Sequence, residues 1–317
     1  MTQSIDAMIA DAMVHVTERA AIACAPEIGR GDKIKADQAA VDAMRTALNE
    51  VAMQGRIVIG EGERDEAPML YIGEEVGTGT GQAIDIALDP LEGTTLTANA
   101  MPNALAVLAI APRGGLLHSP DVYMQKIAIG PGYEDGIIDL DVSAGENISR
   151  MAEAKGKPVS EMTACVLLRE RHNEIIKSLR DAGARISFIT DGDVAGVINT
   201  TDPSTGIDLY VGSGGAPEGV LAAAALKCVG GQMQGRLLFR NDDERGRAER
   251  VGITDLNRKY YLNDLASTHT VFCATGVTNG GLVDRVRING DRAETQTLVM
   301  MSETGLVRKI SSNRRIA

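Results

Sequence analysis

Residues 83–95 read A-I-D-I-A-L-D-P-L-E-G-T-T, and this stretch gives the strongest indication of the fold. Its first six residues alternate large apolar side chains with small or acidic ones, which is the period-2 pattern of a β-strand. Pro90 has no backbone N–H to donate to a neighbouring strand, and it favours an extended conformation at Asp89. We therefore expect a strand over 83–88 that ends at Asp89.

Two carboxylates and a hydroxyl gather where this strand is expected to end. Asp89 closes the strand, and Glu92 and Thr94 follow on a turn to which Gly93 gives backbone freedom. Hard oxygen ligands at this spacing suit Mg²⁺ or Mn²⁺, which keep coordination sites open for water and a substrate phosphate. A solvated acidic turn is the alternative, because a lone D-P-x-E-G-T motif does not decide between the two.

Three more acidic residues stand where an expected strand ends or an expected helix begins. Glu61 follows the short apolar run 56–59, between two glycines that allow a sharp turn. Asp37 opens an apolar pattern of helical spacing over 37–51. Glu218 lies in the first turn of an expected helix, where a carboxylate could also serve only to stabilise the helix dipole. The three residues are further candidates for a shared acidic centre.

The rest of the chain alternates expected strands and helices, so periodicity alone predicts a mixed α/β protein. Residues 104–111 are almost wholly apolar, as in a strand that is covered on both faces. We expect another strand at 137–142 and an exposed loop in the charged run 241–250. Asn289-Gly290 predicts a β-hairpin. The basic segment 308–315 could be an interface or a disordered tail.

Composition limits the functions that are open to the chain. Its 317 residues permit one large domain or two packed halves, and the net charge of −11 argues against a nucleic-acid surface. The four cysteines are widely spaced in apolar surroundings, which favours buried reduced thiols. Because the sequence has neither an apolar run of membrane-spanning length nor a signal-peptide pattern, we expect a cytoplasmic protein without a membrane partner.

The ordered set of motifs resembles class II fructose-1,6-bisphosphatases, metal-dependent sugar phosphatases that are distantly related to inositol monophosphatases. The matching segments are G-R-G-D-K (29–33), I-V-I-G-E-G-E-R-D-E-A-P-M-L-Y-I-G-E (57–74), D-P-L-E-G-T (89–94), N-A-L-A-V-L-A (103–109), P-D-V-Y-M-Q-K (120–126), D-G-D-V-A (191–195) and G-G-A-P-E-G (214–219). They occur in family order over about residues 15–280. This set is much more specific than one motif, and it disfavours a merely solvated turn at Asp89 and Glu92.

The resemblance implies a fold, an activity and a metal centre. The fold is the layered α/β (α+β) sugar-phosphatase fold, in which sheets and helix layers alternate, with an N-terminal metal-binding half (1–158) and a C-terminal substrate-binding half (159–317). The activity is hydrolysis of fructose 1,6-bisphosphate to fructose 6-phosphate and phosphate, a step of gluconeogenesis. The implied ligands of Mg²⁺ or Mn²⁺ are Asp37, Glu61, Asp89, Glu92 and Glu218. The implied catalytic residues are Thr94, Glu61 and Asp89, with Thr94 orienting or deprotonating the attacking water.

The resemblance also implies a set of substrate contacts in a homo-oligomeric enzyme, a dimer or a tetramer. The implied substrate-binding residues are Glu92, Gly93, Thr94, Tyr123, Arg169, Glu170, Arg171, Asp191, Gly192, Asp193 and Gly215. Activity on sedoheptulose 1,7-bisphosphate as well stays open. A non-catalytic sugar-phosphate binding protein is a more remote alternative, since an anion binder has little use for five carboxylates unless metal ions intervene.

Arg169 and Arg171 invite a more specific expectation. They flank Glu170 in a loop between an expected strand and an expected helix, where a guanidinium can bind a phosphate through two hydrogen bonds. We expect them to hold the non-reacting phosphate with help from Tyr123. Exposed arginines paired with Glu170 or Glu174 are the alternative. The chain departs here from the family pattern K-P-R, so a planar guanidinium replaces an ammonium and a carboxylate is added.

Overall fold

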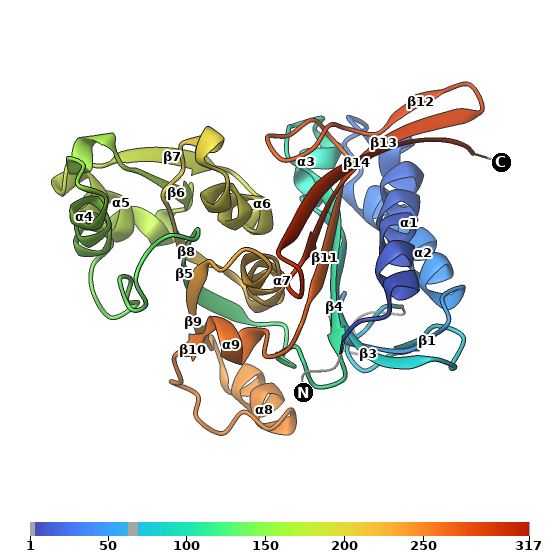
Figure 1. The fold of residues 1–317 in the computed structure, drawn as a ribbon, viewed down its shortest axis with the longest axis horizontal. Helices are drawn as coiled ribbons and strands as arrows, with labels where there is room; N and C mark the ends of the chain where they lie inside the picture. The colour runs from blue at the N-terminus through green and yellow to red at the C-terminus, as the bar shows by residue number, and fades with distance from the viewer. Residues whose placement is uncertain (1–3, 63–68, 317) are drawn as a thin grey trace. The chain divides into compact units, whose positions relative to one another are not determined.

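The computed structural model describes residues 4–62 and 69–316, and its contacts divide the chain into two units. Unit 1 comprises residues 1–118 and 266–317, and unit 2 comprises residues 119–265. Each unit has its own β-sheet and its own helices (Figure 1), so the predicted α/β class is confirmed. The division falls at residues 118 and 265, because residues 123–129 pair within the second sheet and residues 271–276 pair within the first. The metal-binding half 1–158 and the substrate-binding half 159–317 stay a prediction.

Unit 1 contains one mixed sheet in the strand order β12-β13-β11-β4-β3-β1-β2, with β14 paired to β13. Strands β1 and β3 are parallel, and the other neighbours are antiparallel. The elements are α1 (Ala7–Cys24), α2 (Lys33–Asn49), β1 (Met53–Ile59), β2 (Glu75–Val76), β3 (Gln82–Glu92), α3 (Thr94–Ala98), β4 (Leu105–Pro112), β11 (Val271–Gly276), β12 (Arg287–Asn289), β13 (Arg292–Met301) and β14 (Leu306–Arg315).

Helices α1 and α2 lie side by side against the sheet of unit 1 (Figure 1). Met13 of α1 and Met44 of α2 are fully buried in one apolar cluster with Ile57 of β1 and Ile86 of β3. All eight residues of β4 are buried, as predicted from its apolar sequence. Burial on this scale, at roughly 25 cal/mol per Å² of apolar surface, is the main source of stability for a sheet of this size.

Strand β3 continues through Pro90 to Glu92, so the expected end at Asp89 is wrong. Between Asp89 and Glu92 the register with β4 shifts, which marks a β-bulge. A bulge leaves a residue out of the ladder, so the missing N–H of proline costs no hydrogen bond there. Gly93 then adopts φ +91°, a left-handed conformation that suits glycine, and α3 begins at the next residue.

Unit 2 contains a six-stranded sheet in the order β10-β9-β5-β8-β6-β7. Strands β6, β7 and β8 are mutually parallel, and β5 is antiparallel to both β8 and β9. The elements are β5 (Tyr123–Ile129), α4 (Ala144–Lys155), β6 (Thr163–Leu167), α5 (Asn173–Asp181), β7 (Arg185–Ile189), α6 (Asp193–Ile198), β8 (Leu209–Gly215), α7 (Ala216–Lys227), β9 (Gln232–Leu238), α8 (Asp242–Arg250), β10 (Tyr260–Tyr261) and α9 (Leu262–Leu265).

Helices cover both faces of the sheet in unit 2. Ile148 of α4 and Leu179 of α5 share an apolar cluster with Ile127 of β5. Gly219 of α7 lies against Met124, which points to the opposite face of β5 because it is three residues away. The order helix layer, sheet, helix layer within this unit agrees with the expected layered fold.

The segment 137–142 is not a strand, contrary to the expectation from its apolar residues. Its backbone groups bond to two side chains instead of a neighbouring strand. Gln234 accepts from the N–H of Leu140 at 3.0 Å and donates to the carbonyl of Ile138 at 2.7 Å. Asn147 bonds both backbone groups of Asp139, at 2.7 and 2.9 Å. These side chains satisfy the polar groups that a buried segment must pair.

The charged run 241–250 is helix α8 and not the expected loop. Asn241 caps it, with its side-chain oxygen accepting the N–H of Glu244 at 2.9 Å. The first turn is acidic and the last turn is basic, which complements the helix dipole. Arg247 also pairs with Asp243 one turn away. Capping and charge order thus make a helix without an apolar stripe.

Asn241→Ala should lower the free energy of unfolding by about 1 kcal/mol, because it removes the hydrogen-bonded cap of α8. Urea denaturation followed by circular dichroism measures this change. Asp242→Ala is the control for the charge of this turn, since it removes a fully exposed acid and its ion pair with Arg245 without touching the cap, and it should cost less. Equal midpoints for the two variants would contradict a stabilising cap.

The C-terminal part of the chain is ordered. The predicted hairpin is confirmed, with Asn289 of β12 paired to Arg292 of β13. The basic segment 308–315 is part of β14, which pairs with β13 over its whole length, so the disordered alternative is wrong. Arg314 of this strand binds the buried carboxylate of Glu18 on α1.

The four cysteines are buried thiols, as expected. Burial raises the pKa of the Cys24 and Cys165 thiols to about 12, so they stay protonated and unreactive near neutral pH. Within residues 4–62 and 69–316, no helix is both long and apolar enough to cross a membrane.

Candidate active site

The acidic residues of unit 1 share one edge of its sheet. Strands β1 and β3 run parallel, so their carboxyl ends lie at the same edge. Glu61 follows the end of β1, and Asp89 and Glu92 lie on either side of the bulge at the end of β3. The charged residues 63–66 of the same matched segment lie outside the described residues. Strand direction therefore explains how segments distant in sequence converge.

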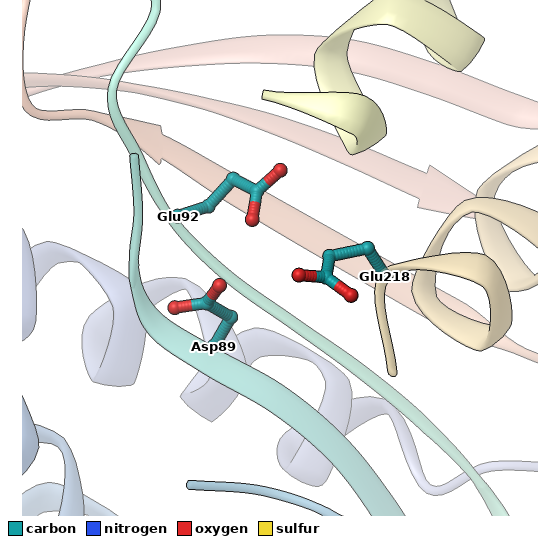
Figure 2. A group of neighbouring side chains, drawn as sticks. All are labelled: Asp89, Glu92 and Glu218. Carbon is teal, nitrogen blue, oxygen red and sulfur yellow. The ribbon is translucent and has the colours of Figure 1, made fainter. Parts of the chain in front are cut away.

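Asp89 and Glu92 bring their carboxylates together. Ligand oxygens of the two side chains lie within 4.8 Å of each other. One oxygen of Asp89 accepts the N–H of Leu91 at 3.0 Å, which fixes the orientation of the carboxylate, and Glu92 is only 4 % exposed. Figure 2 shows both side chains at the end of β3. Two ionised carboxylates at this distance repel each other unless positive charge lies nearby, which is the condition a bound cation meets.

Thr94 and Asp37 lie on the two helices next to this edge. Thr94 is the half-buried first residue of α3, whereas Thr95 beside it is exposed. The segment before α2 is tied to α3 by two backbone hydrogen bonds, from Gly29 and Gly31. Helix α2 starts at Lys33, so Asp37 lies in its second turn and does not open the helix as expected. Burial raises the pKa of the Asp37 carboxyl.

Not every predicted ligand joins this pair. Asp37 and Glu61 do not belong to the group of carboxylate oxygens that lie within 4.8 Å of one another. A centre for two metal ions spreads its ligands over more than one ion, since such ions are about 3.5–4 Å apart. The positions of Asp37 and Glu61 as ligands therefore stay predictions.

The substrate-binding residues predicted in unit 2 also share a sheet edge. Because β5 is antiparallel to β8 and β9, the carboxyl ends of β6, β7, β8 and β9 meet the start of β5 at one edge. Ligands of open α/β sheets bind outside the carboxyl ends of strands. The predicted residues at this edge are Tyr123 at the start of β5, Arg169, Glu170 and Arg171 after β6, Asp191, Gly192 and Asp193 after β7, and Gly215 at the end of β8.

Glu218 occupies the first turn of α7, as predicted. A side chain at Gly215 would place its Cβ 1.9 Å from one carboxylate oxygen of Glu218, so only glycine leaves room for that carboxylate. Oxygen Oε2 of Glu218 is buried and has no hydrogen-bond partner among the described residues. Burial raises the pKa of the Glu218 carboxyl, although Lys126 nearby opposes this effect. A buried carboxylate oxygen without a donor fits a cation ligand.

Lys126 is a residue of this edge that the sequence analysis did not single out. Its side chain is fully buried, and its ammonium donates to Asp193 at 2.5 Å and to the carbonyl of Gly215 at 2.9 Å. A side chain at Gly214 would again collide, here with the carboxylate of Asp193 at 2.0 Å. Lys126 is the last residue of the matched segment P-D-V-Y-M-Q-K, and its place in that motif is the sequence feature that could have identified it. It joins two predicted substrate-binding residues.

The loop after β7 presents an acidic residue and a glycine with an unusual backbone conformation. Gly192 adopts φ +87° and precedes α6, and its N–H donates to the carboxylate of Asp191 at 3.2 Å. Burial raises the pKa of Asp191, and the nearby guanidinium of Arg169 opposes this effect. Asp193 is 6 % exposed and is held by Lys126, so one of its oxygens is already engaged.

The two arginines after β6 are held by backbone carbonyls. Arg171 donates to the carbonyl of Ser213 at 2.7 Å, and its guanidinium carbon lies 5.2 Å from the centre of the Tyr123 ring. Arg169 donates to the carbonyl of Thr190 at 2.6 Å. Among the described residues neither arginine forms an ion pair, so the alternative of a pairing with Glu170 or Glu174 is not observed. Both side chains are exposed and keep their charge available.

Comparison with known proteins identifies the family. The sequence model of the family "Bacterial fructose-1,6-bisphosphatase, glpX-encoded" matches residues 7–314. Fructose-1,6-bisphosphatase 1 class 2 of Escherichia coli (strain K12) is 46% identical over 312 residues, which cover 94% of this chain and 92% of that protein. Fructose-1,6-bisphosphatase class 2 of Shigella flexneri has the same identity and coverage.

The chain therefore belongs to the family of bacterial, glpX-encoded fructose-1,6-bisphosphatases. It is an enzyme, a phosphoric monoester hydrolase. Among solved structures, extragenic suppressor protein suhB from Bartonella henselae matches 62% of this chain and 75% of its own, with a TM-score of 0.34 and 14% identity. That likeness is too weak to carry an argument.

Proposed function

We infer that the chain hydrolyses the 1-phosphate of fructose 1,6-bisphosphate and releases fructose 6-phosphate and phosphate, a reaction of gluconeogenesis. The family match over residues 7–314 supports this inference. The structural observation behind this inference is that Asp89 and Glu92, at the sheet edge of unit 1, place carboxylate oxygens within 4.8 Å of each other. A metal-dependent phosphatase uses such an acidic centre to hold its cations, whereas carboxylates without metal ions would hinder a protein that only binds an anion.

We propose that Asp37, Glu61, Asp89, Glu92 and Glu218 hold Mg²⁺ or Mn²⁺. All five supply hard carboxylate oxygens. Oε2 of Glu218 is buried and has no hydrogen-bond partner in the described part of the chain, which supports a cation there. Such ions, when bound, neutralise phosphoryl oxygens and lower the pKa of a coordinated water. The absence of histidine and cysteine from this set disfavours Zn²⁺ as the natural metal.

The residues of the chain then have separate tasks. The hydroxyl of Thr94 would orient the attacking water or help to deprotonate it, since Thr94 follows Glu92 and Gly93 in the sequence. Asp191, Gly192, Asp193 and Gly215 would contact the sugar and fix its orientation. Lys126 would keep Asp193 and the Gly215 carbonyl in place. Positioning and electrostatic stabilisation suffice for this reaction without a covalent intermediate.

Phosphate release from a panel of sugar phosphates tests the proposed reaction. We expect fructose 1,6-bisphosphate to be cleaved with the highest kcat/KM, and fructose 6-phosphate to be left intact. Sedoheptulose 1,7-bisphosphate belongs in the panel because it shares the arrangement of two terminal phosphates. Binding of these sugars without phosphate release in the presence of Mn²⁺ and of Mg²⁺ would overturn the proposal.

Arg171→Ala should raise KM for fructose 1,6-bisphosphate by about 10-fold or more, because a charge-assisted hydrogen bond to the non-reacting phosphate is lost. Hydrolysis of fructose 1-phosphate, which lacks that phosphate, should change little. Steady-state kinetics on the two substrates makes the comparison. Equal losses on both would assign Arg171 to the reacting phosphate, and no loss on either would make it a surface charge.

The homo-oligomer, a dimer or a tetramer, and the cytoplasmic location stay predictions. Size-exclusion chromatography with light scattering determines the first of these directly.

A further inference from the structure

The register of the sheet in unit 2 brings a third arginine to the start of β5. Tyr123 pairs with Gly215 of β8 on one side and with Leu238 of β9 on the other. Arg240 follows Leu238 by two residues, so it leaves the sheet at the same edge as Tyr123. Its guanidinium carbon lies 5.2 Å from the centre of the Tyr123 ring, the same distance as that of Arg171.

Arg240 is held in this position by α8. Its Nε donates to one oxygen of Glu244 at 2.6 Å, and its backbone N–H donates to the other oxygen at 2.6 Å. The side chain of Glu244 is 1 % exposed, so the carboxylate is a fixed point and not a mobile surface group. A guanidinium oriented in advance loses less entropy when it binds a ligand. The arginine itself remains 62 % exposed and can be reached from solvent.

The guanidinium groups of Arg171 and Arg240 therefore both contact the ring of Tyr123. Because each guanidinium carbon lies 5.2 Å from the ring centre, the two carbons are at most twice 5.2 Å apart. Arg240 forms an ion pair with Glu244, whose oxygen lies 2.5 Å from its Nη2, whereas Arg171 forms no ion pair among the described residues, so the two groups together keep one uncompensated positive charge. Among residues 4–62 and 69–316, neither Nη1 atom has a hydrogen-bond acceptor. A phosphate dianion could accept hydrogen bonds from both guanidinium groups through these atoms and would balance the remaining positive charge.

We propose that Arg240 is a specificity-determining residue that binds the non-reacting phosphate together with Arg171. The inference rests on the proposed function, in which Arg171 and Tyr123 hold that phosphate. It adds a contact from β9 and α8, which lie far along the chain from the loop after β6. Two arginines on different sides of the terminal phosphate fix its position as well as balance its charge. A sugar monophosphate that lacks this phosphate forms neither contact and should bind more weakly than the bisphosphate.

Arg240→Ala should raise KM for fructose 1,6-bisphosphate by about 10-fold with kcat nearly unchanged, since it removes a charge-assisted contact that exists before and during the reaction. The loss should be confined to the bisphosphate and absent with fructose 1-phosphate. Arg240→Lys should recover only part of the affinity, because an ammonium lacks the planar, two-point geometry. A purely structural role in anchoring α8 would lower both activities together or neither.

Arg245→Ala is the matched control. Arg245 lies on α8, is exposed and, within residues 4–62 and 69–316, pairs only with Asp242, so its removal changes the charge by the same amount and should leave KM unaltered. If KM rose equally in Arg245→Ala, the rise in Arg240→Ala would be explained by the lost positive charge alone, and the proposal would be overturned.

The double variant Arg171→Ala/Arg240→Ala separates this inference from the proposed function. If both residues bind one phosphate, the rise of KM in the double variant should be smaller than the product of the two single rises. A selective loss in Arg171→Ala with none in Arg240→Ala would overturn the role of Arg240 while the phosphate anchor stands. If neither variant separates the bisphosphate from fructose 1-phosphate, the anchor itself is wrong.

Discussion

Exhaustive chelation with EDTA should abolish phosphate release from fructose 1,6-bisphosphate, and Mn²⁺ or Mg²⁺ should restore it. The proposed ligands are all carboxylates, which suit these ions and not Zn²⁺. Asp89 and Glu92 hold carboxylate oxygens within 4.8 Å of each other, and a divalent cation between them would attract the phosphate of an anionic substrate. A phosphate-release assay with graded metal concentrations measures the effect. Full activity after dialysis against EDTA would remove the basis of the proposed mechanism.

Glu218→Gln refines this first expectation. The metal concentration for half-maximal activity should rise at least about 10-fold, because a charged ligand becomes a neutral one, while the melting temperature changes little. Glu174→Gln is the control, since Glu174 also lies in the first turn of a helix, α5, and is exposed. Similar small effects in both variants would return Glu218 to the role of stabilising the helix dipole.

Thr94→Ala should lower kcat by about 100-fold while KM stays similar, because help with proton transfer from the attacking water is worth roughly that much. Thr94→Ser keeps the hydroxyl and should retain a measurable part of the activity. Steady-state kinetics at saturating metal separates kcat from KM. The half-buried position of Thr94 at the start of α3, directly after the bulge and Gly93, motivates the experiment.

Thr95→Ala is the internal comparison for Thr94. The neighbouring hydroxyl is exposed, and its loss should have a mild effect. A Thr94→Ala enzyme with near-normal kcat and a lower melting temperature would show that the hydroxyl only supports the turn. Equal losses of kcat in the two variants would mean that the helix itself, and not one hydroxyl, is required.

Local patterns predicted those parts of the fold that depend on neighbouring residues. Alternation predicted β3, an apolar run predicted the buried β4, and Asn289-Gly290 predicted the hairpin. Pro90 misled the prediction because its effect depends on a bulge in the pairing with β4, which is a contact between distant segments. Such a contact cannot be read from the proline and its neighbours alone.

Two further differences have the same kind of cause. The apolar segment 137–142 looked like a strand, but side chains from elsewhere in the sequence, such as Gln234, satisfy its backbone. The run 241–250 looked like a loop because it lacks an apolar stripe, yet its cap and its order of charges support α8. Charge order was visible in the sequence and could have predicted this helix.

The residues of the candidate site also fall into two groups, those that local motifs predict and those that depend on strand pairing. Motifs at strand ends predicted Asp89, Glu92 and Glu218, because a carboxylate beside a glycine or a proline stands out in the sequence. Lys126 and Arg240 did not stand out, because their importance depends on what the sheet register brings beside them: Asp193 for the first and Tyr123 for the second. Residues of that kind become visible only when the strands are paired.

The discontinuity of unit 1 has a consequence for the synthesis of the chain. Strand β4 pairs with β11, and all of unit 2 lies between them in the sequence. On the ribosome, unit 2 is complete and able to fold before β11 has been translated. Until then β4, which is wholly buried in the finished protein, remains an unpaired apolar edge on that side. The nascent chain is therefore most exposed to aggregation while its central unit is already folded.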